Sequence, residues 1–299
     1  MKRWLVRQLV KWMAPKLRFI HHNPELWRYV ESKGYHVTPV HFYQPIPDTR
    51  ELDELYRART EAPGIDWQEQ QQLRLVNEAF PPYAAEYTAF HEGLRAAGRL
   101  AERRLEFIGY DPVAYHCMIR HFKPARIIEV GAGYSTLIAF NAAAQNGATE
   151  ITAIEPYPGD MLSGIASEIH LVKQIAQRVD IGVFSELQAN DILFIDSSHI
   201  VKTGSDVCYL VLEALPRLAE GVIVHFHDIF LPFDYPMTWL KQRRVFWNEQ
   251  YLIHAYLLHN QRARILFANR YMIENHPEAL RRAFPDSPTT SGGSLWLRV

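Results

Sequence analysis

A glycine turn between a β-branched segment and a helical segment is the first feature that points to chemistry. Residues 126–130 read Arg-Ile-Ile-Glu-Val, and Gly-Ala-Gly-Tyr-Ser-Thr follows directly. Glycines at such a point let the backbone turn sharply towards a ligand, and the start of the helix presents unpaired N–H groups. A second expected strand, 150–154, ends on Glu155, whose two carboxylate oxygens suit the two hydroxyls of a ribose. Together the turn and Glu155 predict a nucleoside cofactor site.

The residues of the turn argue against a cofactor that carries phosphate. A dinucleotide-binding turn needs a third glycine beside the pyrophosphate, whereas Gly131 and Gly133 are here followed by Thr136. Glu129 would be an awkward neighbour for a pyrophosphate but would attract an ammonium group. The chain contains no G-x-x-x-x-G-K-[ST] run, which disfavours a P-loop nucleotide hydrolase. These features favour S-adenosylmethionine, and a nicotinamide-dependent oxidoreductase on a similar sheet is the rival enzyme class.

Two segments rich in acids and histidines follow later expected strands. They are Asp-Ser-Ser-His at 196–199 and His-Phe-His-Asp at 225–228. Neighbouring parallel strands end at the same edge of a sheet, so we expect both segments to face the reacting methyl group. We predict that His199, His227 and Asp228 are catalytic, with one imidazole as general base for an acceptor hydroxyl.

A metal ion is the alternative for this second group of residues. Asp196, His227 and Asp228 offer ligands for Mg²⁺, a hard ion that prefers carboxylates and water. Metal-free base catalysis is favoured, because His227 stands where a second carboxylate would make the stronger magnesium site. His225 follows an apolar strand and is expected to be a hydrogen-bonded core residue. The serines of the first segment lack a nucleophile-elbow context, so a serine hydrolase is not expected.

The pattern along the chain predicts an α/β domain preceded by a mainly helical lobe. Residues 1–109 combine helical spacing at 52–56 and 70–79 with several prolines and no strand pattern. From residue 110 onward, short β-branched runs alternate with helical stretches, as in a parallel sheet covered by helices on both faces. A long helix is expected at 238–258. The expected strands are 126–130, 150–154, 169–173, 192–195, 222–225, 264–268 and 294–298.

Composition narrows the class of protein. The 299 residues include 32 basic and 33 acidic side chains, a formal net charge of −1, so the positive field of a nucleic-acid-binding protein is missing. Only Cys117 and Cys208 occur, which fits a reducing compartment and argues against structural zinc. Charges interrupt every apolar run in residues 1–20, which argues against a spanning helix. Packing of this basic amphipathic segment against protein is favoured over contact with a membrane surface.

The motifs together resemble a known family. E-V-G-A-G-Y-S-T, I-E-P-Y-P, D-I-L-F-I-D-S-S-H and V-H-F-H-D-I-F are similar to those of class I S-adenosylmethionine-dependent methyltransferases, in particular a bacterial branch whose fourth strand ends in D-S-S-H. The resemblance covers about 110–299 and implies a Rossmann-like seven-stranded sheet with an antiparallel final strand. It implies that Glu129, Gly131, Gly133, Ser135 and Thr136 surround the methionine end of the cofactor and that Glu155 holds the ribose. The predicted cofactor set also includes Ala132, Tyr134, Pro156 and Asp196.

Each motif also has an ordinary structural explanation. Glycine turns often serve geometry alone, and Glu155 and Asp196 are each also suited to capping a helix. Their joint placement favours a cytoplasmic enzyme that methylates a small molecule, with a hydroxyl oxygen as the preferred acceptor. A methyltransferase-like scaffold that has lost catalysis is the non-enzyme alternative. The sequence leaves open the acceptor, metal dependence and the formation of a homo-oligomer.

Overall fold

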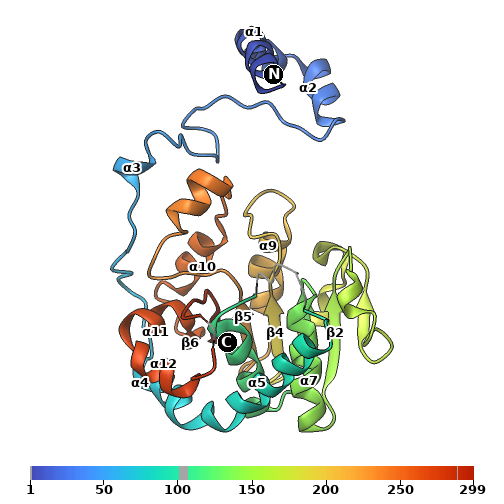
Figure 1. Cartoon of the computed structure of the whole chain (residues 1–299), viewed down its shortest axis with the longest axis vertical. Coiled ribbons are helices and arrows are strands. Elements are labelled where there is room, and N and C mark those ends of the chain that lie inside the picture. Colours follow the sequence, from blue (N-terminus) through green and yellow to red (C-terminus); the bar gives the residue numbers. More distant parts are fainter. Residues whose placement is uncertain (1, 101–106, 288) are drawn as a thin grey trace. The chain divides into compact units, whose positions relative to one another are not determined.

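The computed structural model describes residues 2–100, 107–287 and 289–299, which fall into two compact units (Figure 1). The helical unit comprises Met1–Tyr56 and Pro236–Phe246, and the sheet unit comprises Arg57–Tyr235 and Trp247–Val299. The expected boundary at 109/110 falls inside the sheet unit, because helices of residues 69–96 pack on its other helices and on a strand. Residues 101–106 of the expected lobe lie outside the described residues.

The sheet unit is built on a seven-stranded sheet in the order β3-β2-β1-β4-β5-β7-β6. Strand β7 is antiparallel to β5 and β6, whereas β1 to β5 pair in parallel. The strands are β1 (Arg126–Val130), β2 (Glu150–Ile154), β3 (His170–Val172), β4 (Ile192–Ile195), β5 (Ile223–Phe226), β6 (Arg264–Ala268) and β7 (Leu295–Arg298). The expected α/β class, the seven strands and the antiparallel final strand are confirmed.

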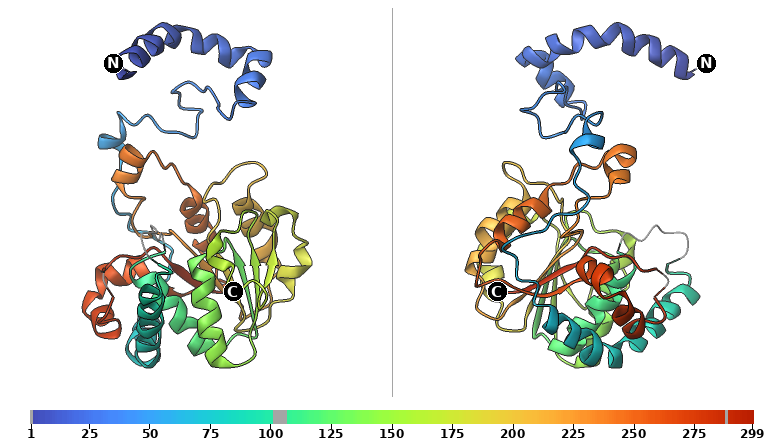
Figure 2. Two further views of the ribbon diagram at one scale, coloured as in Figure 1. Left: turned by 45° about the vertical axis from the view of Figure 1, so that its right-hand side comes forward. Right: turned by 90° about the vertical axis from the view of Figure 1, so that its left-hand side faces the viewer.

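Helices cover both faces of this sheet (Figure 2). Successive strand residues point to opposite faces, so Ile127 belongs to one hydrophobic core and Ile128 to the other. The first core includes residues of α6, α7 and α12, and the second includes residues of α8, α9 and α10. The helices are α4 (Glu69–Arg74), α5 (Pro81–Ala96), α6 (Tyr110–Phe122), α7 (Tyr134–Asn146), α8 (Ile181–Ser185), α9 (Asp206–Tyr209), α10 (Glu249–Leu257), α11 (Asn269–Asn275) and α12 (Pro277–Ala283).

Shorter helical turns complete the sheet unit. Two π-helical turns continue α4 and α9, and three 3-10 turns lie between other elements. They are η1 (Leu75–Ala79), η2 (Asp160–Leu162), η3 (Ala176–Arg178), η4 (Leu210–Ala214) and η5 (Leu215–Arg217).

The expected helix over 238–258 is wrong as a single element. A π-helical turn, η6 (Trp239–Arg243), ends at Arg244, which adopts a left-handed conformation with φ +57°. The chain leaves the helical unit there, and α10 begins at Glu249 in the sheet unit. An apolar periodicity continues across such a break, so hydrophobic spacing alone does not reveal it.

Besides η6, the described residues of the helical unit form three helices. They are α1 (Lys2–His22), α2 (Pro24–Glu31) and α3 (Leu52–Leu55). Asn23 caps α2, since its side-chain oxygen accepts hydrogen bonds from Glu25 N–H and Leu26 N–H. Lys241 of η6 pairs with Asp53 at 2.6 Å. In the described part of the chain, no helix combines the length and apolar character needed to cross a bilayer.

Candidate functional site

The glycine turn is fixed by its contact with the neighbouring strand end. Gly131 has φ +85°, and a β-carbon added there would lie 1.8 Å from the backbone oxygen of Asp196. Only glycine fits this close approach. The turn continues into α7, where the Thr136 hydroxyl accepts a hydrogen bond from Gly133 N–H at 3.0 Å. Thr136, the residue that argued against a dinucleotide turn, thus helps to cap the start of this helix.

Glu155 lies beside the turn. It follows β2, which pairs with β1, and its Oε2 accepts a hydrogen bond from Ala132 N–H at 3.3 Å. Its Oε1 accepts another from Tyr157 N–H at 2.8 Å, while the Tyr157 ring is 86% exposed. Ala132, Gly133, Glu155 and Pro156 are all partly exposed, so this edge of the sheet is open to a ligand.

Glu129 is a buried carboxylate with one oxygen left without a partner. It has no exposed surface, and the Tyr115 hydroxyl donates to its Oε1 at 2.9 Å. Oε2 has no hydrogen-bond partner among the described residues. Burial raises the pKa of Glu129 to about 7, although the nearby hydroxyl groups of Thr136, Tyr115 and Ser135 oppose the rise. An incoming cation would relieve this burial cost.

Tyr134 is buried and faces other aromatic side chains. Its hydroxyl lies 2.6 Å from His91 Nδ1 and 3.1 Å from the Tyr87 hydroxyl. Burial raises the pKa of Tyr134 to about 12. These side chains and Phe107 help to line a cavity of about 280 Å³. Phe107 also packs edge-on against the His227 ring, with ring centroids 5.1 Å apart, so one residue of the cavity wall contacts the segment that follows β5.

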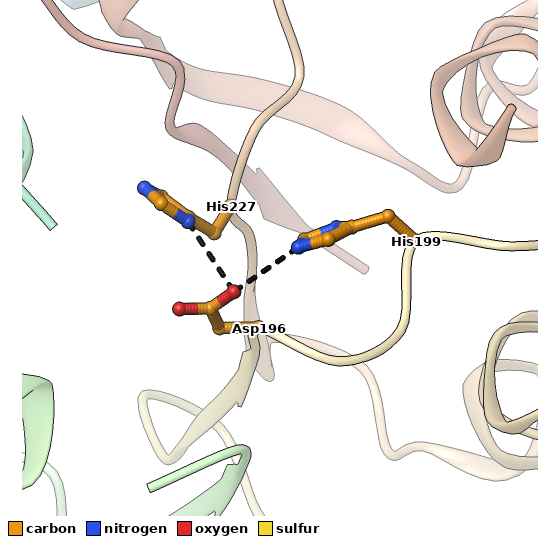
Figure 3. A group of neighbouring side chains, drawn as sticks. All are labelled: Asp196, His199 and His227. Carbon is orange, nitrogen blue, oxygen red and sulfur yellow. Dashed lines mark ion pairs between the residues drawn. The ribbon is translucent and has the colours of Figure 1, made fainter. Parts of the chain in front are cut away.

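Asp196 lies between two histidines (Figure 3). Its Oδ1 is 3.3 Å from His199 Nε2 and 3.3 Å from His227 Nδ1. Asp228 Oδ2 lies 4.0 Å from His199 Nε2 and 3.6 Å from His227 Nδ1. The structure therefore brings together all three predicted catalytic residues and Asp196.

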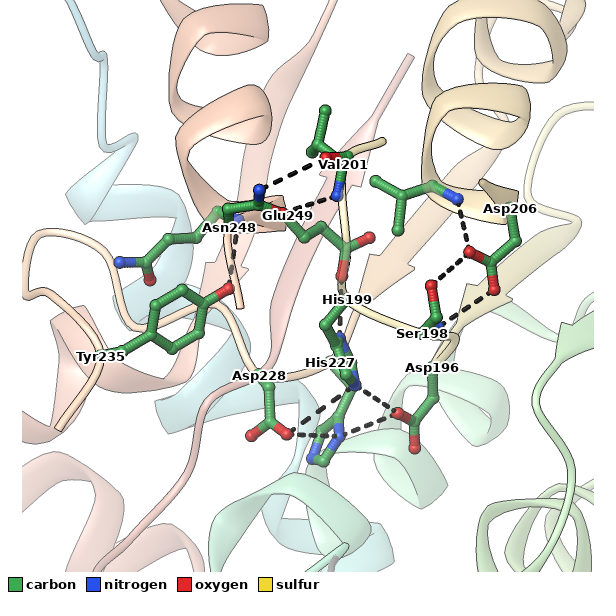
Figure 4. A network of polar contacts seen from close by, with 12 residues as sticks. Asp196, Ser198, His199, Val201, Asp206, His227, Asp228, Tyr235, Asn248 and Glu249 are labelled. Atoms are coloured by element: carbon green, nitrogen blue, oxygen red, sulfur yellow. Dashed lines mark hydrogen bonds and ion pairs between the residues drawn. The ribbon is translucent and has the colours of Figure 1, made fainter. Parts of the chain in front are cut away.

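Two further carboxyl groups hold the outer nitrogens of these histidines. His199 Nδ1 lies 2.8 Å from Glu249 Oε2 (Figure 4), and His227 Nε2 lies 3.6 Å from Asp111 Oδ2. Asp111 also accepts hydrogen bonds from Gly293 N–H and Ser294 N–H. Sequence reasoning missed both acids. Glu249 lay inside the single long helix expected there, and Asp111 resembles an ordinary first-turn acid at the start of α6.

The loop that carries His199 is held in place by the segment before α10. Asn248 N–H and Glu249 N–H both donate to the His199 carbonyl oxygen, at 3.1 and 3.2 Å. The Trp247 ring lies over the imidazole of His199 at 4.2 Å between centroids. Asp206 accepts a hydrogen bond from Ser198 N–H at 3.1 Å (Figure 4). Asp206 therefore anchors this loop as well as standing in the first turn of α9.

Neighbouring carboxylates favour the protonated form of both histidines. Burial alone would lower the pKa of His199, but hydrogen bonds to Asp196 and Glu249 outweigh it and raise the pKa to about 10. Burial likewise opposes protonation of His227, yet the charges of Asp196 and Asp228 raise its pKa well above 6.5. Burial raises the pKa of Asp228 to about 6. These shifts favour the protonated form of both imidazoles, and the general-base role of one of them stays a prediction.

His225 is a core residue, in agreement with expectation. It has no exposed surface, and its ring stacks on Phe194 with centroids 4.0 Å apart. Its Nε2 lies 2.8 Å from the Ser294 hydroxyl. Burial lowers the pKa of His225 well below 6.5, so this ring is neutral and structural.

The donor set fits a divalent cation better than the sequence suggested. Ligand atoms of Asp196, His199 and His227 all lie within 4.8 Å of one another. His199 takes the place of Asp228 in the expected set. Two imidazoles and one carboxylate suit divalent first-row metal ions, such as Mn²⁺ or Zn²⁺, more than Mg²⁺. The surrounding carboxyl groups need positive charge, which either two imidazolium protons or one divalent ion supplies.

Comparison with known proteins gives the family. Residues 128–229, which hold the glycine turn, Glu155 and the histidine cluster, match the family model described as a methyltransferase domain. An uncharacterized protein of Archaeoglobus fulgidus is 34% identical over 172 residues, which are 51% of this chain and 74% of the archaeal protein. The chain belongs to the methyltransferase-domain family. This relative is archaeal, so the narrower bacterial branch stays a prediction.

Solved methyltransferase structures are similar only at the level of topology. The S-adenosylhomocysteine-bound methyltransferase PaMTH1 of Podospora anserina has 19% identity and a TM-score of 0.42, covering 77% of this chain and 93% of that one. A structure described as a putative O-methyltransferase from Klebsiella pneumoniae has 14% identity and a TM-score of 0.36, covering 78% and 98%. Neither likeness bears on the substrate of this methyltransferase-domain protein.

Proposed function

We propose that this protein is an S-adenosylmethionine-dependent methyltransferase that acts on a small molecule at a hydroxyl oxygen. One observation carries the proposal: Gly131 lies so close to the Asp196 backbone oxygen that an added β-carbon would be 1.8 Å from it. The cofactor turn and the Asp196–His199–His227 cluster therefore meet at one edge of the sheet. A methyl donor over the turn would lie next to polar groups able to orient an acceptor.

The residues around the turn match the two ends of the cofactor. The unpartnered Oε2 of Glu129 is a buried acceptor with a strong preference for a nearby cation, which suits the ammonium of the methionine moiety. Glu155 stands at the end of β2, where a carboxylate can accept hydrogen bonds from both ribose hydroxyls. Neither feature favours a pyrophosphate, so the nicotinamide alternative has less support.

The cavity beside Tyr134 supports a small acceptor. Its volume of about 280 Å³ and its lining by Tyr87, Tyr134 and Phe107 suit a compact, largely apolar molecule. Methyl transfer from a sulfonium is an in-line displacement, for which the protein mainly aligns the acceptor and excludes water. His199 and His227, each fixed by two or more carboxylates, are rigid enough to orient an acceptor hydroxyl.

A divalent cation is compatible with this proposal, with Asp196, His199 and His227 as the residues that would hold it. Such an ion lowers the pKa of a coordinated hydroxyl when bound. Asp111 and Glu249 would then fix the outer nitrogens of the two imidazoles, as carboxylates do behind metal-binding histidines. Asp228 Oδ2, at 4.0 Å from His199 Nε2 and 3.6 Å from His227 Nδ1, would add a further negative charge beside this set.

Replacing Glu155 tests the cofactor site. The change Glu155→Ala should weaken binding of S-adenosylhomocysteine by about 1 to 3 kcal/mol, or roughly 5- to 150-fold, because a ribose-binding carboxylate is lost. Calorimetric titration of the folded protein measures this directly. Glu150→Ala is the matched control, since Glu150 lies at the other end of β2 with an 83% exposed side chain. Equal affinities of the Glu155→Ala variant and the wild type would show that Glu155 does not bind the cofactor.

Metal titration tests the cluster separately from activity. After dialysis against a chelator, the protein should bind one Mn²⁺ or Zn²⁺ more tightly than Mg²⁺ and release protons, because metal-bound imidazoles must be neutral. His199→Gln should weaken this binding at least about tenfold. His170→Gln, which changes an exposed histidine on β3, is the control. A preference for Mg²⁺, or no difference between the two variants, would rule out the His199 ligand.

A further inference from the structure

Helix α1 has one apolar side and one basic side. At 100° per residue, its large apolar side chains cover about half of the circumference. They are Leu5, Val6, Leu9, Val10, Trp12, Met13, Leu17, Phe19 and Ile20, whereas Trp4 lies beside the basic residues. The opposite side carries a stripe of Arg3, Arg7, Lys11 and Arg18. With Lys2 and Lys16 the helix has six basic residues, and its sequence contains no Asp or Glu.

The apolar side of α1 is exposed. No residue of the helix is buried, and Leu9, Trp12 and Phe19 are 61%, 62% and 65% exposed. Among the described residues, the polar contact between an α1 side chain and the following chain lies at the end of the helix, where His21 Nδ1 is 3.0 Å from the Val37 carbonyl oxygen. A continuous apolar strip of this kind on a folded protein marks a binding surface.

We propose that α1 binds the surface of an anionic phospholipid membrane, lying in the plane of the interface. The apolar side chains would enter the boundary between headgroups and acyl chains, and the basic stripe would face the lipid phosphates. The excess of positive charge on α1 favours an anionic membrane over a groove on a partner protein. Trp12 also suits the interface, where indole rings concentrate. Lys2 and Lys16 interrupt the apolar side. Lys2 stands at the start of the helix, and the ammonium of Lys16 lies over the Trp12 ring and can reach the headgroups.

Vesicle co-sedimentation of the full-length protein tests this proposal. The protein should pellet with vesicles of phosphatidylcholine mixed with phosphatidylglycerol, and the bound fraction should fall as salt is added. It should remain largely in solution with vesicles of phosphatidylcholine alone. Failure to pellet with the anionic vesicles, or equal binding to both kinds, would overturn the proposal.

Two sets of charge-removing variants test whether the basic residues of α1 are responsible for vesicle binding. The triple change Arg3→Gln, Arg7→Gln and Lys11→Gln should reduce partitioning onto anionic vesicles by about a hundredfold, since each basic residue near such a surface contributes a factor of about five. The control triple Lys173→Gln, Arg281→Gln and Arg282→Gln removes three exposed charges from the sheet unit. It should bind vesicles like the wild type. Equal losses in both triples would show only a general charge effect and would contradict a role for α1.

A second pair of changes tests the apolar side against a protein partner. Leu9→Ser with Trp12→Ser should weaken vesicle binding at least tenfold and leave the melting temperature and the mass in solution unchanged. If α1 instead packs on this chain or on a second copy, the same changes would lower the melting temperature or dissociate an oligomer while vesicle binding stayed the same. That result would overturn the membrane proposal.

Discussion

Gly131→Ala is expected to destabilise the sheet unit by about 3 kcal/mol or more, or to prevent its folding. A left-handed conformation alone costs a non-glycine residue about 1 to 2 kcal/mol. The added β-carbon would also overlap the Asp196 backbone oxygen at 1.8 Å, a contact that only a backbone shift between β1 and β4 can relieve. Denaturant unfolding followed by circular dichroism measures the loss.

Substitutions at two other glycines distinguish the backbone cost from the steric overlap. Gly204 has φ +73° with no atom within 4 Å of an added β-carbon, so Gly204→Ala should show the backbone cost alone. Gly133→Ala meets open space at an extended φ, so it should cost less still. If Gly131→Ala were no more destabilising than Gly204→Ala, the close packing of the turn on Asp196 would be wrong.

Glu129→Gln is expected to stabilise the ligand-free protein and weaken cofactor binding at the same time. Burial raises the pKa of Glu129 from 4.5 to about 7. The native state therefore holds its proton more tightly than the unfolded state, and stability is lost as pH rises from about 4.5 through 7. Gln cannot ionise and avoids that loss. At pH 8 the variant should be more stable by up to about 3 kcal/mol.

The same change removes the negative charge proposed to hold the ammonium of the cofactor. Affinity for S-adenosylhomocysteine at pH 8 should fall by about ten- to a hundredfold, as expected for a lost hydrogen bond to a charged group. The stability difference should shrink towards zero at pH 4, where Glu129 is protonated in both states. Glu150→Gln, on an exposed side chain, should change neither quantity. If the Glu129→Gln variant bound S-adenosylhomocysteine as tightly as the wild type, Glu129 would have no role in binding the cofactor.

Much of the sheet could be predicted because its strands are buried on both faces. The run Ile192–Ile195, for example, is apolar throughout and is followed by an acidic residue. The sequence therefore indicates both that it is a strand and where the strand ends. The observed β3 and β7 are shorter than expected, and β5 is shifted by one residue. The break at Arg244 could not be predicted, because a single left-handed residue leaves the apolar spacing unchanged.

The site residues that directly follow a strand could be predicted from the sequence. Glu155, Asp196 and His227 follow β2, β4 and β5, and parallel pairing alone brings them to one edge. Glu249 and Asp111 reach the cluster from helices distant in the sequence, so no local pattern indicates them. Hydrogen bonds to Asp196 and Glu249 raise the pKa of His199, and the contribution of Glu249 could not be predicted from the sequence.

A crystal structure of the complex with S-adenosylhomocysteine tests the central claim most directly. We predict density over Gly131, with the ribose hydroxyls on Glu155, the ammonium within reach of Glu129 and the sulfur facing Asp196 and His227. Density for the ligand elsewhere, or a ribose that makes no contact with Glu155, would contradict the proposed cofactor site.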